Sequence, residues 1–229
     1  MYLDDSSNVV SGLSLYSHLA AGTPGSVDGL LKIWRDYGSG KISLHQLLFP
    51  AIQLAERGFP ISHEFAQVLN IFHDFFKKDD GARAIFIKKN DEPWQVGNRL
   101  IQRDLARTLK RIMSKGRAGF YKGKTAQLIA REMTEGNGFI TREDLDNYRS
   151  VYRTVVTGSF RDLEIISMGP PSSGGVLLIQ MLNMLEQYSL DTLGWNSSDY
   201  IHLLTEVERR AFSDRAEHLG DPDFWDVPI

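Results

Sequence analysis

The sequence predicts a helix-rich α+β fold that contains a single β-hairpin. In several segments between residues 26 and 149, apolar residues recur at steps of three and four, which is the spacing of amphipathic helices. Residues 151–168 instead have a period of two and are rich in β-branched and aromatic side chains, as strands are. Within a single segment, 1–229, we therefore expect 26–149 to be mostly helical and 150–229 to hold the hairpin with a buried and an amphipathic helix.

The composition limits both fold and function. With 229 residues, of which 42% are hydrophobic, the chain can build a core, so general disorder is excluded. The 26 Lys and Arg residues against 29 Asp and Glu give a formal net charge of -3, which argues against a nucleic-acid-binding protein. The absence of cysteine excludes disulfides, a thiol nucleophile and thiolate metal sites. No apolar run approaches the roughly 20 residues of a membrane helix.

The first elements are predicted from caps and helix breakers. After the turn signal at residues 22–25, Ser26 can cap a helix that runs to Asp36. Ser43 starts a second helical pattern that ends before Gly58. Pro50 lies inside this pattern, so we expect a kink or two short helices there.

The middle of the chain is predicted to be helical apart from one short apolar run. A helix capped by Ser62 presents an apolar face as far as Phe76. The run 84–87 is expected to be a strand or a buried extended segment. Three further helices are expected over residues 98–115, 124–133 and 141–147, the last of which opens with a Thr-Arg-Glu-Asp capping sequence.

The remaining residues predict the hairpin and the helices that cover it. The strands are expected at 151–160 and 163–168, joined by a two-residue turn. Residues 176–185 are apolar at nearly every position, and a helix of that kind belongs between two layers of structure. An amphipathic helix over residues 198–218 follows.

Gly123, Lys124 and Thr125 match the end of a phosphate-binding loop but not the rest of it. That loop needs a glycine where this chain has Ala118, and it follows a strand, whereas a helix is predicted here. We therefore predict a plain turn between two helices.

The histidines and acidic residues lack the spacing of metal ligands. His63 and His73 are expected on one helix and facing solvent. Asp221 and Asp223 are predicted to form a turn or a cap rather than a calcium loop. We therefore assign no metal ligand and no cofactor. The six histidines are His18, His45, His63, His73, His202 and His218.

The segment from Pro170 to Gly175 is the most informative local feature. Ser172 and Ser173 precede a helix whose first amide groups carry partial positive charge and can hold a carboxylate or an oxyanion. The alternative is structural: one serine caps the helix, while Gly174 and Gly175 allow close packing on the hairpin. Neither serine has a histidine placed to activate it, so a nucleophilic serine would lack its base.

Several short motifs occur in order over nearly the whole chain, each weak alone but specific as a series. They are Leu19–Val27, Pro50–Ala55, Gly58-Phe59, Phe120–Gly123, Gly138–Thr141, Asp144-Leu145, Tyr148, Ser167-Met168, Pro170–Gly175, Asp214-Arg215 and Leu219–Phe224. In order and spacing they resemble the γ-glutamyltransferase (γ-glutamyl transpeptidase) family, specifically the middle and later part of its large subunit. Lys124 and Thr125 then correspond to variable residues after the family's Phe-Tyr-x-Gly turn.

This resemblance implies an enzyme of the N-terminal-nucleophile hydrolase superfamily with a layered αββα fold, to whose central sheets this chain contributes its hairpin. Such a precursor is a zymogen that cuts itself into a large and a small subunit. The cut exposes an N-terminal threonine whose amine is the base for its own hydroxyl. That threonine attacks the γ-glutamyl amide of glutathione or a relative, and the acyl-enzyme passes the γ-glutamyl group to water or an amino acid.

The resemblance also implies an internal fragment of the large subunit. The family's nucleophile, its arginine for the substrate carboxylate and its oxyanion donors have no match in residues 1–229, so no catalytic or substrate-binding residue is assigned. The expected partners are the rest of the precursor, including the small subunit, and, for the full enzyme, γ-glutamyl compounds and acceptor amino acids; nucleic acid is not expected. Full-length relatives usually enter the secretory route, which implies a periplasmic, secreted or cell-surface parent.

Other activities stay open within and outside this superfamily. The parent could be an acylase or a poly-γ-glutamate depolymerase, and the chain could instead be a non-catalytic helical binding module. Supplied alone, the chain is expected to be inactive. Its uncovered strand edges and apolar faces predict self-association or marginal stability.

Overall fold

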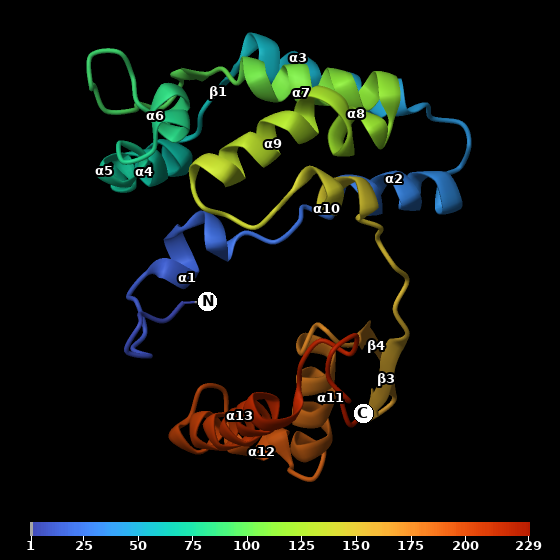
Figure 1. Cartoon of the computed structure of the whole chain (residues 1–229). Helices are drawn as coiled ribbons and strands as arrows, with labels where there is room; N and C mark the ends of the chain where they lie inside the picture. The colour runs from blue at the N-terminus through green and yellow to red at the C-terminus, as the bar shows by residue number, and fades with distance from the viewer. Residues whose placement is uncertain (1) are drawn as a thin grey trace. The chain divides into compact units, whose positions relative to one another are not determined.

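The computed structural model describes residues 2–229, which form two compact units (Figure 1). The first unit ends at Ser150, and the second comprises Val151–Ile229. None of the helices in the described residues has both the length and the apolar character that a membrane crossing requires.

The elements of the first unit are α1 (Leu13–Tyr16), the 3-10 turn η1 (His18–Ala20), α2 (Ser26–Tyr37), α3 (Leu44–Arg57), β1 (Phe59–Pro60), α4 (His63–Ile71), α5 (His73–Phe76), α6 (Asp80–Phe86), β2 (Arg99–Leu100), α7 (Arg103–Lys115), α8 (Ala118–Tyr121), α9 (Gly123–Glu135) and α10 (Arg142–Asn147).

Helices α3 and α7 pack side by side in the first unit (Figure 1). Ser43 opens α3 with a capping box: its hydroxyl accepts a hydrogen bond from the Gln46 amide, and the Gln46 side chain accepts one from the Ser43 amide. Ile52 of α3 is buried, as are Ala106 and Ile112 of α7. The cap predicted at Ser43 is therefore confirmed, and the apolar stripes of the two helices form part of the core.

Pro50 does not divide this helix. α3 runs without a break from Leu44 to Arg57 with Pro50 inside it, so the prediction of two short helices is wrong. A proline in a helix interior removes one backbone hydrogen bond and costs roughly 3 kcal/mol. The capping box at the start of α3 and the burial of Ile52 and Ala55 in its second half offset that cost.

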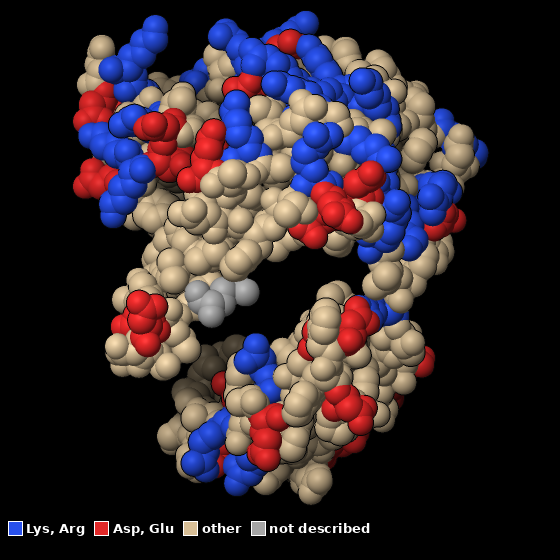
Figure 2. All heavy atoms as spheres, in the orientation of Figure 1, with Lys and Arg blue, Asp and Glu red and all other residues tan. Residues whose placement is uncertain are grey.

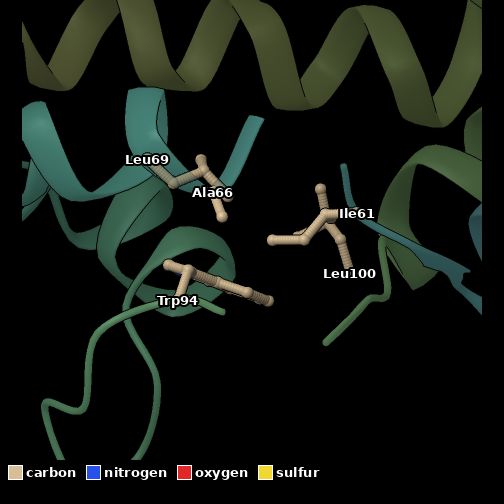
Figure 3. Packing of buried hydrophobic residues seen from close by; sticks show 5 residues of the cluster. All are labelled: Ile61, Ala66, Leu69, Trp94 and Leu100. Carbon is tan, nitrogen blue, oxygen red and sulfur yellow. The ribbon is translucent and has the colours of Figure 1, made fainter. Parts of the chain in front are cut away.

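One hydrophobic cluster of the first unit joins α4 to the segments around β1 and β2. In Figure 3 its side chains point toward one another from these segments. The indole of Trp94 is fixed there because its Nε1 donates a hydrogen bond to the carbonyl of Phe86 at 2.7 Å. The buried members of this cluster are Ile61, Ala66, Leu69, Trp94 and Leu100.

The apolar run 84–87 is helical for its first three residues, so the predicted strand is wrong. α6 begins after Asp79, whose carboxylate accepts a hydrogen bond from the amide of Ala82 at 2.6 Å. The helix places Ile85 and Phe86 against the cluster around Trp94. A run of four apolar residues does not distinguish a short helix from a strand. Here the cap at Asp79 favours the helix.

The helix predicted over 98–115 begins later than expected. Arg99 and Leu100 pair with β1 as a short antiparallel ladder, and α7 starts only at Arg103. Leu100 is 2% exposed, so its burial in the cluster fixes this segment in an extended conformation. The amide of Gln102 then donates a hydrogen bond to the carbonyl of Ala55 at 2.9 Å, which joins the segment to α3.

The second hydrophobic cluster of the first unit packs α8, α9 and α10 together. Thr141 opens α10 with the predicted capping box, in which Asp144 takes the place of the usual glutamate. Ser26, by contrast, is already helical and does not cap α2; the N-cap is Gly25. A Cβ at that position would lie 2.2 Å from the hydroxyl of Tyr148, so only glycine fits. The buried members of this cluster are Tyr121, Ala126, Ile140 and Leu145.

The second unit is a β-hairpin covered by helices. The predicted hairpin is confirmed, with antiparallel register from Val155 opposite Met168 to Phe160 opposite Leu163, but its first strand begins at Val155 and not at residue 151 as predicted. The predicted buried helix lies against both strands on one side and against the long amphipathic helix on the other. The elements are β3 (Val155–Phe160), β4 (Leu163–Met168), α11 (Gly174–Leu185), α12 (Leu190–Leu193) and α13 (Ser198–His218).

The two faces of the hairpin have different surroundings. Its inner face packs on α11, where a Cβ at Gly158 would lie 2.5 Å from the side chain of Ile179. Its outer face carries Val155, Ile166 and Met168, which are 52%, 64% and 66% exposed. The described residues thus contain a sheet that is covered on one side and whose other side exposes these three apolar residues beside the polar Thr157, Ser159 and Glu164.

Gly175 and Gly174 provide a matched test of how α11 packs on the hairpin. A Cβ at Gly175 would lie 2.2 Å from the carbonyl oxygen of Met168, so Gly175→Ala forces the backbone to move and should cost about 1–3 kcal/mol. A Cβ at Gly174 would meet nothing closer than the Ser172 hydroxyl at 3.6 Å. Gly174→Ala should therefore be neutral or stabilising by up to about 1 kcal/mol. Urea unfolding of both variants checks this, and equal losses would contradict it.

Candidate functional site

A buried carboxylate, that of Asp28, lies in the first turn of α2. The residue is 8% exposed. Its Oδ1 accepts a hydrogen bond from Arg117 Nε at 2.8 Å, while its Oδ2 accepts bonds from the amide of Ser150 at 2.8 Å and from its hydroxyl at 2.6 Å. These contacts span 89 and 122 positions of sequence. We call Asp28, Arg117, Tyr121 and Ser150 the Asp28 network.

Arg117 binds the C-terminal end of α10 as well as Asp28. Its Nη2 donates to the carbonyls of Leu145 at 3.4 Å and Asp146 at 3.1 Å, and also to that of Tyr148. Carbonyls at a helix C-terminus lack partners within the helix, and a cation is favourable beside them because of the helix dipole. The same guanidinium therefore neutralises Asp28 and caps α10.

Tyr121 connects the network to the segment before α2. The residue is 1% exposed. Its hydroxyl donates to the carbonyl of Pro24 at 2.6 Å and accepts a bond from the amide of Asp28 at 3.2 Å. Its ring stacks on that of Tyr148, with centroids 5.8 Å apart, and lies 4.5 Å from the guanidinium of Arg117. The hydroxyl of this tyrosine thus both donates and accepts a hydrogen bond.

The protonation states of the network favour structure over catalysis. Burial alone would raise the pKa of Asp28, but the hydrogen bonds from Ser150 and Arg117 and the guanidinium charge outweigh it and hold that pKa below its ordinary value. Burial also raises the pKa of the Tyr121 phenol, which stays protonated. Asp28 is ionised, but both its oxygens are occupied. The network therefore offers no free acid, base or nucleophile.

A hollow of about 510 Å³ beside the network is lined by cationic side chains. Two of them already bind backbone carbonyls: Lys32 Nζ donates to Ser150 at 2.7 Å, and Arg149 Nη1 donates to Tyr148 at 2.6 Å. On the face shown in Figure 2, cationic and anionic side chains are mixed over each unit. The hollow is positively charged, but Lys32 and Arg149 already bind backbone carbonyls of the chain.

The segment from Pro170 to Gly175, singled out in the sequence, runs from the end of β4 into the first residues of α11 and contains a cis Pro170-Pro171 bond. Ser173 is the N-cap of α11, as one alternative predicted, but its side chain makes no capping bond; its Oγ accepts a bond from Arg215 Nε at 3.0 Å. The Ser172 Oγ instead accepts a bond from the amide of Gly174, the first residue of the helix, at 3.3 Å. Close packing on the hairpin is confirmed at Gly175, whereas Gly174 has room for a side chain.

A second hollow, of about 410 Å³, lies in the second unit between β3, α11 and α13. Its polar groups are partly engaged, since the Gln180 amide donates to Asp214. Val156, Ile179 and Ile229 supply apolar walls. This hollow suits an apolar side chain better than a reacting group.

The Gly123-Lys124-Thr125 sequence forms the first turn of α9, so the predicted turn between two helices is wrong for these residues; only Lys122 separates α8 from α9. Thr125 is 5% exposed and serves the packing of this corner. Its hydroxyl donates to the carbonyl of Gly119 at 2.7 Å and accepts a bond from Arg111 Nε at 2.8 Å. The hydroxyl that would bind a metal–phosphate group in a phosphate loop is thus occupied.

The prediction that His63 and His73 face solvent from one helix is correct for His63 only. The chain divides into α4 and α5 at Phe72, and His73 is partly buried. Its Nε2 lies 2.9 Å from Asp91 Oδ1, and its Nδ1 lies 3.2 Å from Asp74 Oδ1. Contact with the loop before β2, which the sequence does not reveal, turns this ring inward.

Asp221 and Asp223 form the predicted turn. The amide of Asp223 donates to Asp221 Oδ1 at 3.0 Å, and the Asp223 carboxylate pairs with Arg153. Within residues 2–229, no group of three or more histidine or acidic side chains is arranged to hold a metal ion.

The sequence motifs missed the Asp28 network. The matched stretch 19–27 stops one residue before Asp28, and an acidic residue in the first turn of a helix is ordinarily explained by the helix dipole. A weak signal is Gly25, because glycine is used where another group approaches the backbone closely. Here that group is the Tyr148 hydroxyl, and the carbonyl of Tyr148 accepts a bond from Arg117.

Comparison with known proteins gives a consistent result. A family model described as gamma-glutamyltranspeptidase matches residues 1–229. A glutathione hydrolase proenzyme of Escherichia coli (strain K12) is 41% identical over 229 residues, covering 100% of this chain and 39% of the relative. The acylase ACY 1 proenzyme of Pseudomonas sp. (strain V22) is 39% identical over 210 residues, covering 92% of this chain and 37% of the relative.

Among solved structures, the γ-glutamyltranspeptidase of Helicobacter pylori matches with a TM-score of 0.94 and 44% identity, covering 100% of this chain and 65% of that one. This likeness identifies the fold as that of the N-terminal-nucleophile γ-glutamyltranspeptidases. The chain spans about two fifths of the length of the curated relatives it matches, 39% in the Escherichia coli case.

Replacing Asp28 should weaken the first unit in a pH-dependent way. Asp28→Asn removes the charge that pairs with Arg117, and we expect a loss of about 2–3 kcal/mol at pH 7. Because the pKa of Asp28 is lowered by folding, its contribution is fully present above the unfolded pKa of about 3.9 and is lost as the pH falls through the folded pKa. Urea unfolding from pH 7 to pH 3 should show the two proteins converging.

Asp104 supplies the matched control for this measurement. It forms an exposed ion pair with Arg107 in the same unit, and Asp104→Asn should cost less than about 1 kcal/mol. A loss as small as this for Asp28→Asn, or a gap that does not narrow in acid, would refute the assignment of a buried ion pair.

Proposed function

Because the chain belongs to the gamma-glutamyltranspeptidase family, we propose that it is the scaffold part of an enzyme that transfers the γ-glutamyl group of glutathione, or of a related amide, to water or to an amino acid. The main support is the match of the family model to residues 1–229. The Escherichia coli relative bears the name glutathione hydrolase proenzyme, which supports this substrate class and a precursor form.

The proposed chemistry needs an N-terminal threonine, which is formed when the precursor is cut. The amine of that residue takes the proton of its own hydroxyl, and the Oγ attacks the γ-glutamyl carbonyl. The amide C–N bond breaks, the leaving amine takes a proton, and an ester to the enzyme forms. Water or the amine of an amino acid then attacks this ester, releases the γ-glutamyl group and returns the threonine.

We infer that this threonine lies in the part of the family's length that the chain does not span. The threonines within helices of the chain are unsuited to the role because their hydroxyls bond locally: Thr125 bonds to Gly119, and Thr205 Oγ1 donates to the carbonyl of Ile201 at 2.8 Å. An N-terminal nucleophile instead needs a free α-amine on the same residue.

The outer face of the hairpin is the surface that the rest of the precursor is proposed to cover. Val155, Ile166 and Met168 are apolar and exposed on a sheet whose other face is occupied by α11. In an αββα fold the second sheet packs on such a face at about 10 Å. The partner proposed here is therefore a sheet formed by the remaining three fifths of the precursor.

An acylase is the second candidate, and one observation favours it. The identity to the acylase ACY 1 proenzyme, 39%, is close to the 41% shared with the glutathione hydrolase. The scaffold alone therefore does not select between a γ-glutamyl and another acyl group. A substrate comparison on a complete enzyme separates the two: turnover of an acyl amide without a γ-glutamyl group would favour the acylase.

The chain alone should not catalyse γ-glutamyl transfer. Incubated with γ-glutamyl-p-nitroanilide, it should release p-nitroaniline no faster than buffer does, because the nucleophile is proposed to lie elsewhere. Absorbance of the released nitroaniline measures this, and clear turnover would overturn the scaffold assignment.

A chimera gives the positive arm of the same test. Residues 1–229 replace the matching stretch of the Escherichia coli relative, with which they share 41% identity. The chimera should cut itself into two subunits and hydrolyse γ-glutamyl-p-nitroanilide. A folded chimera that neither processes nor turns over would contradict the proposed function.

Ile166→Ser tests the proposed sheet contact. Ile166 is 64% exposed, so the variant should leave the unfolding of the isolated chain nearly unchanged while it lowers self-association in sedimentation. In the chimera, the same variant should slow processing. Leu163→Ser is the matched control, since Leu163 is 58% exposed but lies opposite Phe160 at the end of the hairpin. Equal effects of the two variants would contradict a contact at the outer face.

A further inference from the structure

The segment that leaves the first unit has no regular structure of its own. Residues 148–154 belong to neither a helix nor a strand, yet β3 begins directly afterwards. Backbone amides and carbonyls in such a segment must find partners outside a ladder. Here side chains of the first unit supply those partners.

All three hydrogen-bonding groups of Ser150 are engaged at this point. Its amide and hydroxyl donate to Asp28, and its carbonyl accepts a bond from Lys32 at 2.7 Å. Two residues earlier, the carbonyl of Tyr148 accepts bonds from Arg117 and Arg149. The last residues of the first unit are thus held by four charged side chains.

Because the partners are charged, the hydrogen bonds that attach residues 148–150 are both strong and specific. Bonds to an ionised partner are roughly twice as strong as neutral ones. Asp28 is nearly buried, and its two oxygens are divided between Arg117 and Ser150, so a displaced Ser150 would leave the carboxylate without two of its donors. A shift of the segment therefore loses several bonds together.

We propose that Asp28 and Arg117 are positioning residues of the parent enzyme, which hold residues 148–150 at the end of the first unit in the conformation that self-cleavage and catalysis need. This inference rests on the proposed function. Self-cleavage and acyl transfer both require reacting atoms held within a fraction of an ångström, and displacements of about 1 Å cost up to about a hundredfold in rate. Asp28 and Arg117 contact neither substrate nor nucleophile and act through Ser150.

Asp28 could instead contribute only to the stability of the first unit, and a variant of Leu69 distinguishes that role from positioning. Leu69 is 2% exposed in the cluster around Trp94, whose buried members include no residue of the Asp28 network, so Leu69→Ala destabilises the same unit without loosening Ser150. Asp28→Asn keeps the shape of the side chain and removes its charge. The two variants thus separate positioning from stability.

The first measurement uses the chain as it is. Amide hydrogen exchange at Ser150 should accelerate about tenfold or more in Asp28→Asn, while Leu69→Ala leaves Ser150 protected relative to the rest of the first unit. Unchanged exchange at Ser150 in Asp28→Asn would overturn the proposal whether or not the parent is a γ-glutamyl enzyme.

The second measurement uses the chimera, at a temperature where both variants are folded by circular dichroism. Asp28→Asn should slow self-cleavage and lower kcat for γ-glutamyl-p-nitroanilide about tenfold or more, with KM within about twofold, whereas Leu69→Ala should change neither by more than about twofold. Equal effects of the two variants, or none from Asp28→Asn, would overturn the proposal. An inactive unsubstituted chimera would count instead against the proposed function.

Discussion

The buried carboxylate of Asp28 is the constraint on which the arrangement of the first unit depends. A charge removed from water is tolerated only when a partner and hydrogen bonds replace the lost solvation. Asp28 obtains them from Arg117 and Ser150, far along the sequence, and Arg117 in turn caps α10 and lies over Tyr121. Because removing one member leaves the others unpaired, α2, α8 and the end of α10 are positioned together.

Local signals predicted those elements whose ends are decided within a few residues. The caps at Ser43, Ser62 and Thr141 and the long helix α13 follow from neighbouring side chains. The hairpin follows from the period of two on both sides of Arg161 and Asp162. These features involve few distant contacts, so a single sequence contains them.

Where tertiary contacts determine the local conformation, the sequence alone did not predict it. Leu100 is extended because a distant cluster buries it, and Gly25, which is the N-cap of α2 in place of Ser26, lies against the Tyr148 hydroxyl. The same reason hides the Asp28 network: Asp28, Arg117 and Ser150 are each ordinary in their local context, and only the fold brings them together. Their charge and hydrogen-bond requirements could be predicted from the sequence, but their partners could not.

The proposed division between scaffold and chemistry accounts for the nearly equal resemblance of relatives with different names. A glutathione hydrolase proenzyme and an acylase proenzyme share 41% and 39% identity with this chain. Selecting an acyl group requires side chains that contact it, whereas Asp28 and Ser150 are already bonded to one another. Under the proposal, the residues that select the acyl group therefore lie in the rest of the precursor, and the buried charge of Asp28 constrains only the scaffold.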